Sequence, residues 1–368
     1  MKRLIHVPDY QNSILNVSAS ILNHYGVTTA YSTLKILDQE LKKDYKHVIL
    51  MVLDGMGINI LNHNLSSDSL LRKNLKTTLS SVFPPTTTAA TTAILSGLPP
   101  ISSGHLGWTQ YNQIDDSITT VFLNTDYYNP NKVLTHNLQR DSLSYINIVD
   151  QIREVNPNLH LEILFPSFKI GGHETFDDEL NRLLMITKGS KSFSYCYWTE
   201  PDSTIHEAGI TGLKTKQIVK ALNTSYERFL SEIGENILVI TTADHGLIDV
   251  EPILIDDYKD FLDTLRILPS IEPRATTFFV KKDQHELFQT LFNQYFGKDF
   301  VLLSKKEILA SHLFGYGKPH LKINAFIGDY FSIAINNKMF QFLKTKPFKA
   351  HHAGLTKEEL EVPLILNK

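Results

Sequence analysis

Three runs of mostly apolar residues without polar–apolar alternation are the feature that most constrains the fold of this chain. They cover residues 47–53, 193–198 and 236–242. Strands that are buried on both faces, as in a parallel sheet, carry unbroken runs of this kind. The sequence therefore predicts an α/β fold with a mostly parallel central sheet. Amphipathic helices expected at 13–25 and 215–233 would cover the faces of that sheet.

Each of these predicted strands leads into a loop that carries an aspartate, at Asp54, Asp202 and Asp244. In open α/β sheets, ligands bind at the carboxyl ends of the strands, so the three aspartates are candidate site residues. Asp54 is followed directly by Gly55, which allows a tight turn and a close approach of the backbone. A cap on the helix that follows is the simpler interpretation of Asp54.

Histidines accompany two of the aspartates. His206 follows Asp202 by four residues, and on a helical turn this spacing brings a carboxylate and an imidazole within reach of one cation. Asp244 and His245 are adjacent, and both can reach one ion only if the chain turns, which Gly246 permits. A surface ion pair for the first pair, and a turn with a buried histidine for the second, remain open alternatives.

A histidine pair near the C-terminus, His351 and His352, brings the candidate ligands to seven. Aspartate and histidine together suit Zn²⁺ or a similar first-row divalent ion such as Mn²⁺, whereas the single cysteine, Cys196, excludes a site built on a cysteine pair. Two ions of about four ligands each would account for this set, and two ions can clamp the attacking and leaving oxygens of a phosphoryl displacement.

The stretch from Ser80 to Gly97 is the candidate location of an attacking hydroxyl. Pro84 and Pro85 end an extended segment, and a short helix is expected at 88–96 before Gly97 stops it. The unpaired amides at the start of a helix stabilise an attacking oxygen and a phosphate. The alternative is that three consecutive threonines simply compete for the position of helix cap.

The net charge, the length of the apolar runs and the cysteine content limit the partners and the location that we expect for this protein. The 368 residues carry a net charge of −3 and no long basic run, so a nucleic acid polymer is not expected as a partner. The apolar runs have the length of strands and predict no membrane span. The lone cysteine and the absence of a signal-peptide pattern lead us to expect a cytoplasmic protein. The oligomeric state is left open.

The pattern of predicted elements changes at about residue 255. Strands and helices alternate irregularly from there until the chain returns to a core-like pattern near 346. We therefore expect a small α+β cap at 255–345, inserted into a metallohydrolase core domain formed by residues 1–254 and 346–368.

These motifs make the chain resemble the alkaline phosphatase superfamily, and within it the type I phosphodiesterase/nucleotide pyrophosphatase family. The resemblance covers residues 48–355 and implies a three-layer α/β/α sandwich. It rests on five anchors in the family's order: Leu53-Asp54-Gly55, Phe83-Pro84-Pro85-Thr86-Thr87 with Gly97-Leu98, Pro201-Asp202 with His206, Asp244-His245-Gly246, and His352-Ala353-Gly354-Leu355.

The resemblance implies a role for each matching residue. Thr87 matches the nucleophile, which would also bind the ion that activates it. The other implied ligands of that ion are Asp54, Asp244 and His245. The implied ligands of the second ion are Asp202, His206 and His352. His351 is the weaker candidate of its pair, because the family's ligand directly precedes the small–Gly–Leu sequence.

The chain also departs from the family pattern. Thr88-Ala89-Ala90 stands where nucleotide pyrophosphatases have Phe-Pro-Asn, and Trp108 falls near the position of a phosphate-binding asparagine. Trp108 could stack on a base or another flat group, or belong to the core. No arginine lies near Thr87 in sequence, which favours diesters over monoesters. Thr88, Trp108 and Arg274 are the candidate substrate-binding residues, with a surface position as the alternative for Arg274.

The implied function is metal-dependent hydrolysis of phosphodiester or pyrophosphate bonds through a covalent phosphothreonine intermediate, with a small phosphodiester or nucleotide as substrate. The alternatives are another activity of the superfamily (phosphomonoesterase, phosphonoacetate hydrolase or phosphomutase), a catalytically inactive metal- or nucleotide-binding protein, and a structural metalloprotein. A sulfatase is not expected, since the sequence has no Cys-x-Pro-x-Arg or Ser-x-Pro-x-Arg motif.

Overall fold

A central six-stranded sheet organises the structure, a computed structural model that describes residues 5–368. Its strand order is β2-β17-β8-β1-β7-β6. The strands β6, β7, β1 and β8 run parallel, and only β17 runs against its neighbours. The predicted α/β class and the mostly parallel sheet are therefore confirmed. The bounds are β1 His47–Leu53, β2 Leu75–Ser80, β6 His160–Leu164, β7 Ser192–Trp198, β8 Ile237–Thr242 and β17 Glu361–Asn367.

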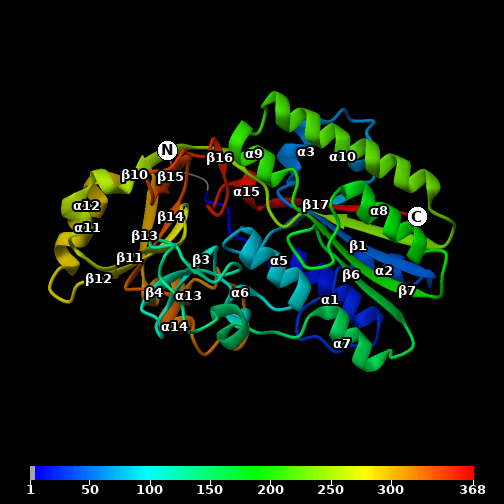
Figure 1. Cartoon of the computed structure of the whole chain (residues 1–368), viewed down its shortest axis with the longest axis horizontal. Coiled ribbons are helices and arrows are strands. Elements are labelled where there is room, and N and C mark those ends of the chain that lie inside the picture. The colour runs from blue at the N-terminus through cyan, green and yellow to red at the C-terminus, as the bar shows by residue number, and fades with distance from the viewer. Residues whose placement is uncertain (1–4) are drawn as a thin grey trace.

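The three apolar runs form the middle of this sheet. Every residue of β1 and of β8 is buried, as expected for strands covered on both faces. Helices α1, α5 and α7 lie on one face of the sheet and α3, α8 and α10 on the other, which gives three layers (Figure 1). The bounds of these helices are α1 Ile14–His24, α3 Ile58–Asn64, α5 Thr87–Ser96, α7 Ile148–Val155, α8 Phe176–Ile186 and α10 Leu213–Glu232.

Several elements outside these layers are shorter. They are the helices α2 Lys35–Leu41, α4 Leu70–Lys73, α6 Pro100–Ser103, α9 Asp202–Ala208 and α15 Lys357–Leu360, and the short strands β9 Ile248–Asp249, β10 Glu251–Leu254, β15 Lys338–Gln341 and β16 Ala350–His351. A π-helical turn (Leu138–Ser142) and a 3₁₀ turn (Ile255–Asp257) complete the set. Within residues 5–368, no helix is long and apolar enough to cross a membrane.

A second, seven-stranded sheet lies beside the first, in the left half of Figure 1. Its strand order is β13-β14-β12-β11-β3-β4-β5. The bounds are β3 Thr109–Asn112, β4 Ser117–Thr120, β5 Thr125–Asp126, β11 Leu265–Glu272, β12 Ala275–Val280, β13 Phe300–Ser304 and β14 Tyr330–Ala334, with helices α11 Lys259–Leu262, α12 His285–Phe296, α13 Lys305–Ala310 and α14 Ile323–Phe326.

The second sheet uses two separate parts of the chain. Strands β11 to β14 come from the predicted cap at 255–345, whereas β3 to β5 come from 109–126 and join it where β3 pairs with β11. The boundaries 1–254, 255–345 and 346–368 stay a prediction. We propose that 109–126 belongs with the second sheet as one structural unit.

One predicted strand differs in the structure. The stretch 323–335, expected to show strand patterning, begins with the helical turn α14 and continues as β14. Ile323 and Phe326 are both buried, at a spacing of three residues, which is the spacing of one helical face and not of one strand face.

Candidate metal centre and nucleophile

The three aspartates meet at one edge of the central sheet. Strand β1 pairs in parallel with β7 on one side and with β8 on the other, so all three strands end together. The Asp202 amide donates to the Asp54 carbonyl oxygen at 3.1 Å, and the Gly55 amide donates to Asp244 Oδ1 at 3.0 Å. Gly55 has a φ of 71°, and a Cβ on it would lie 2.9 Å from Asp202 Cβ. The glycine is therefore required both for the turn and for the approach of the two loops.

Thr87 begins the helix that points its first amides at this edge. The proline pair leads to Thr86, which is extended with a φ of −143°, and α5 starts at Thr87. The Thr87 hydroxyl Oγ1 lies 3.2 Å from His245 Nε2 and 3.4 Å from Asp54 Oδ2. Thr86 occupies the cap position, but its side chain makes no capping hydrogen bond. The hydroxyl of Thr87 thus lies beside two of the predicted ligands, at the positive end of a helix.

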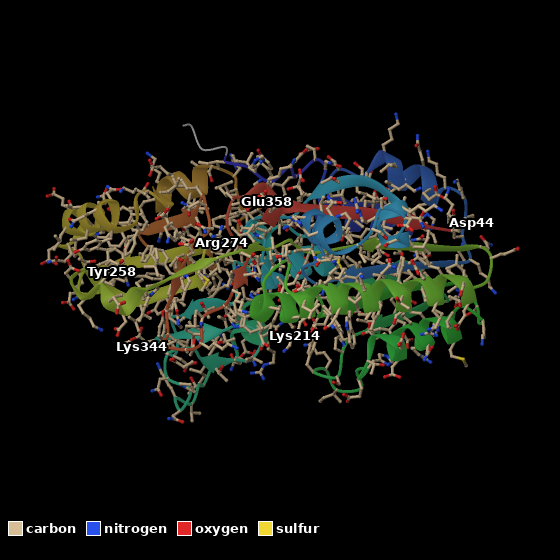
Figure 2. The ribbon with its side chains drawn as sticks, turned by 90° about the horizontal axis from the view of Figure 1, so that it is seen from above. Asp44, Lys214, Tyr258, Arg274, Lys344 and Glu358 are labelled. Carbon is tan, nitrogen blue, oxygen red and sulfur yellow. The ribbon has the colours of Figure 1, made fainter. Side chains whose placement is uncertain are left out.

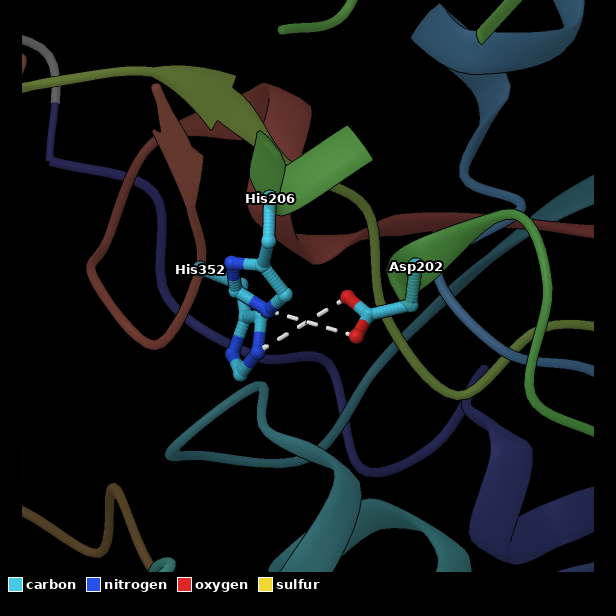
Figure 3. Close-up of side chains that lie close together, drawn as sticks. All are labelled: Asp202, His206 and His352. Carbon is cyan, nitrogen blue, oxygen red and sulfur yellow. Dashed lines mark ion pairs between the residues drawn. The ribbon is translucent and has the colours of Figure 1, made fainter. Parts of the chain in front are cut away.

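Asp202, His206 and His352 form a compact group (Figure 3). Asp202 Oδ2 lies 3.2 Å from His206 Nε2, and Asp202 Oδ1 lies 3.9 Å from His352 Nε2. Asp202 and His206 come from one turn of α9, whereas His352 follows β16. Because Asp202 is only 9% exposed, this pair is not the surface ion pair that the sequence left open.

A second group lies beside Thr87. Asp54, Asp202 and His245 offer ligand atoms within 4.8 Å of one another. Asp244 Oδ2 lies 3.5 Å from His245 Nε2, so the predicted fourth ligand also faces this group. Asp202 belongs to both groups, whereas the sequence predicted it only for the second ion. The structure thus places six predicted ligands around one site.

The three histidines of the site are oriented in the same way. Each directs Nδ1 at a backbone carbonyl, and a proton on Nδ1 leaves Nε2 with a free electron pair for a cation. Burial, and then the neighbouring His245, lowers the pKa of His352 well below its usual value and favours the neutral ring. The contacts are His206 Nδ1 to Ala350 O at 2.8 Å, His245 Nδ1 to Gly246 O at 3.2 Å, and His352 Nδ1 to Pro85 O at 3.1 Å.

Three carboxylate oxygens at the site have no hydrogen-bond partner among the described residues. They are Asp54 Oδ1, Asp202 Oδ1 and Asp244 Oδ2, all of them buried. Burial, and then the charges of Asp244 and Asp202, raises the pKa of Asp54 well above its usual value. A buried carboxylate is costly unless it is paired or coordinates a metal. The donor set therefore fits divalent cations, held by aspartate oxygens and histidine Nε2 atoms.

His351 stays outside both groups. Its Nδ1 accepts a hydrogen bond from the His352 amide at 2.9 Å, and its ring lies 4.9 Å from that of His206. Among the described residues, the ligand groups that the geometry forms include His352 and not His351. The assignment of His352 rather than His351 as the ligand stays a prediction.

A pocket of about 360 Å³ opens beside Thr87 and the group of Asp202, His206 and His352. Trp108 lines it and is 38% exposed, so the alternative of a core tryptophan is wrong. The side chains of Tyr127, Phe342 and Phe348 add further aromatic surface. A larger cavity of about 680 Å³, between α1, α6 and residues 316–321, lies apart and includes none of the candidate ligands in its described lining.

The other two candidate substrate-binding residues do not line this pocket. Thr88 is fully buried, and its hydroxyl has no partner among the described residues. Arg274 is also fully buried, so its predicted surface position is wrong (Figure 2). Its Nε and Nη2 donate to Glu359 at 2.7 and 2.8 Å, and Nη1 donates to the Lys338 carbonyl oxygen at 2.6 Å. These bonds engage all three guanidinium nitrogens, and Arg274 is absent from the described lining of the pocket.

Glu272 lines the pocket but was not predicted from the sequence. It is 2% exposed, and its Oε1 accepts hydrogen bonds from Thr86 Oγ1 at 2.6 Å and from the Trp108 amide at 2.7 Å. Burial raises its pKa to about 7. The signal in the sequence was weak, because Glu272 ends a strand of the second sheet and carries no recognisable motif.

Comparisons with known proteins identify the fold and the family of this chain. No curated protein matches the chain by sequence. Murine ectonucleotide pyrophosphatase/phosphodiesterase 5 matches its structure with a TM-score of 0.64 at 15% identity, over 87% of each chain. The human protein of the same name matches with a TM-score of 0.66 at 13% identity, also over 87% of each chain. An inactive variant of the murine protein, solved in complex with AMP, matches at 14% identity with the same TM-score and coverage as the first.

The structural matches show the alkaline-phosphatase-like fold. The model of the family described as type I phosphodiesterase / nucleotide pyrophosphatase matches residues 48–290, which is more than half of the chain. Those residues include Thr87 and every predicted ligand except His352. The chain belongs to the type I phosphodiesterase/nucleotide pyrophosphatase family.

Proposed function

We propose that this protein hydrolyses phosphodiester or pyrophosphate bonds with two divalent metal ions, Zn²⁺ in the first place and Mn²⁺ as the alternative. The observation that carries the proposal is the position of the Thr87 hydroxyl. It lies at the start of α5, within 3.4 Å of Asp54 and His245, and borders the pocket that also reaches Asp202, His206 and His352.

Each side chain has a role in this reaction. Asp54, Asp244 and His245 would hold one ion beside Thr87, and Asp202, His206 and His352 would hold the other. When bound, the ions supply positive charge that stabilises the attacking and leaving oxygens.

Thr87 loses its proton to solvent and attacks phosphorus in line. The Oγ1–phosphorus bond forms as the bond to the leaving oxygen breaks. Water then displaces Thr87 from the phosphothreonine and releases a phosphate monoester. The first backbone amides of α5 would donate hydrogen bonds to the phosphoryl oxygens in both steps.

The charge of the pocket favours diesters. Among the described residues, no lysine or arginine lines it, and a diester carries one negative charge where a monoester carries two. Trp108 offers a flat surface for a base or another planar group. The AMP complex of the murine relative supports nucleotides as the first substrates to test. We also propose a cytoplasmic location, supported by Cys196, which is buried and unpaired.

The test is hydrolysis of bis-p-nitrophenyl phosphate and of p-nitrophenyl phosphate by enzyme that is stripped with a chelator and reloaded with Zn²⁺ or Mn²⁺. We expect the metal to restore activity with a preference for the diester. A preference for the monoester would contradict the diester assignment. Absence of turnover with either ester and either metal would contradict the proposed hydrolase.

A further inference from the structure

Glu272 holds a fixed position beside the nucleophile. Its Oε1 accepts from the hydroxyl of Thr86, the residue directly before Thr87, and from the amide of Trp108. Two donors on one oxygen restrict the rotation of the carboxylate. Glu272 lines the same pocket as Thr87, Trp108 and His206, so its carboxylate borders the space that a substrate of Thr87 would occupy.

The second oxygen of Glu272 is free towards the pocket. Among the described residues, none donates a hydrogen bond to Oε2, and this oxygen is not among the fully buried atoms that lack a partner. Arg274, two residues further on, forms an ion pair with Glu359 and therefore does not offset the charge of Glu272. Of the carboxylates that line the pocket, Asp202 belongs to the ligand groups and Glu272 does not.

The charge of Glu272 acts differently on the two classes of phosphate ester. Two divalent ions would balance the three ligand aspartates and an ionised Thr87, and Glu272 would then remain as an unbalanced negative charge. Coulomb repulsion is proportional to the charge of the substrate, so a dianionic monoester meets twice the repulsion of a monoanionic diester. For two charges about 7 Å apart at an effective dielectric constant of 20 to 40, one extra substrate charge corresponds to a discrimination of about tenfold to fiftyfold.

We propose that Glu272 is a specificity-determining residue that disfavours dianionic phosphate monoesters in the pocket and so makes the site prefer monoanionic diesters. This inference rests on the proposed function, because it names the substrate class of the same site. The preference for diesters would then have two causes: repulsion by the Glu272 carboxylate, and the absence of lysine and arginine from the described lining of the pocket.

The sharpest variant is Glu272→Gln. The side-chain carbonyl oxygen of glutamine can accept from both Thr86 and Trp108, and its amide nitrogen replaces the charged Oε2. At pH 8 we expect the ratio of kcat/KM for bis-p-nitrophenyl phosphate over p-nitrophenyl phosphate to fall by about tenfold or more, because kcat/KM rises more for the monoester than for the diester. The matched control, Glu251→Gln, removes the same charge from an exposed position on β10 and leaves the ratio unchanged.

An equal loss of both activities in Glu272→Gln would overturn the proposal, because it would make Glu272 a positioning residue for Thr86. An unchanged ratio would overturn it as well.

A binding measurement separates this proposal from the proposed function. In Zn²⁺-loaded protein that carries Thr87→Ala, calorimetry at pH 8 compares inorganic phosphate, a dianion, with dimethyl phosphate, a monoanion. Adding Glu272→Gln should tighten the binding of inorganic phosphate by about tenfold more than that of dimethyl phosphate. Equal affinities with and without Glu272→Gln would overturn the charge filter, even where the wild type hydrolyses diesters. If the wild type hydrolyses neither ester, the proposed hydrolase fails while this comparison still decides the role of Glu272.

Discussion

The hydroxyl of Thr87 is the atom on which the proposed chemistry depends. We predict that Thr87→Ala lowers kcat by about four to six orders of magnitude, as loss of a nucleophile does in other hydrolases. The variant should still bind metal, because Asp54, Asp244 and His245 remain. Steady-state kinetics and metal analysis of the purified variant check both parts. Thr88→Ser, a conservative change at the next position of α5, is the control. Unchanged activity in Thr87→Ala would indicate that the nucleophile is another threonine or a water molecule.

Glu179 gives a prediction on stability that is independent of the site. It is fully buried on α8, accepts a hydrogen bond from Cys196 Sγ at 3.0 Å, and burial raises its pKa to about 8. The unfolded chain releases this proton near pH 4.5, so folding stability falls as pH rises from about 4.5 to 8, by an amount of the order of 5 kcal/mol.

The variant Glu179→Gln is neutral at every pH and keeps an oxygen for Cys196. We therefore predict that its free energy of unfolding, measured with urea at pH 5 and pH 8, changes less with pH than that of the wild type. The difference between the two proteins isolates Glu179 from other groups that titrate. Parallel pH profiles would show that Glu179 is not protonated in the folded state.

Individual residues were predictable from the sequence where their position depends on a short stretch of chain. Asp54 and Asp244 directly follow strands of recognisable apolar character, so their meeting follows from a parallel sheet. Glu272 and Arg274 were not predictable in this way. Glu272 reaches Thr86 and Trp108 only because β11 pairs with β3 across more than a hundred residues, and the partner of Arg274 is Glu359. Neither partnership leaves a periodic signal.

The short helix α15 connects two of the loops that carry ligands. Glu359 accepts hydrogen bonds from the Gly354 amide at 2.7 Å and from Thr356 Oγ1 at 2.7 Å, just after His352. Its backbone oxygen accepts from the Gly246 amide at 3.0 Å, just after His245. Ala353, between His352 and Gly354, has a φ of 88°, which is unfavourable for a residue with a Cβ. The Glu359 contacts therefore hold a strained loop in place.

Arg274 stabilises this helix from the second sheet. Removing one partner of a buried ion pair leaves an uncompensated charge and costs about 3–5 kcal/mol. We predict that Arg274→Met lowers the free energy of unfolding by about this amount and weakens Zn²⁺ binding at the group with His352, measured by urea denaturation and zinc titration. The control is Arg266→Met, because Arg266 is exposed and its contact with Asp329 is 3.8 Å, so it should cost at most about 1 kcal/mol.

Two outcomes decide the role of the Arg274–Glu359 pair. Weakened zinc binding in Arg274→Met with unchanged binding in Arg266→Met supports positioning of the His352 loop. Destabilisation without any change in zinc binding would restrict the pair to a structural role. Adding Glu359→Gln to Arg274→Met should recover part of the lost stability, because it removes the buried charge.

The molecule builds its site from both sheets. The edge of the central sheet supplies the candidate ligands, and the second sheet supplies Trp108 and Glu272 to the pocket. The middle of the central sheet was predictable because β7, β1 and β8 are mostly apolar runs. The extent of the second sheet was not, since 109–126 shows no pattern that ties it to 265–272. The sequence predicted the candidate ligands from the central sheet, whereas other pocket residues come with the second sheet. The metal site was therefore easier to predict from the sequence than the class of substrate.

Removal of metal tests the whole molecule. The largest hydrophobic cluster fills the space between the central sheet and its helices, whereas the candidate ligands lie in loops at one edge of that sheet. We therefore predict that a chelator abolishes hydrolysis but leaves the far-ultraviolet circular dichroism spectrum intact at 25 °C. The Tm should fall, because Asp54, Asp202 and Asp244 then face one another without a cation, and it should rise with added Zn²⁺ as the logarithm of its concentration. Loss of the spectrum on chelation would instead identify a structural metalloprotein, whose folding depends on the ions.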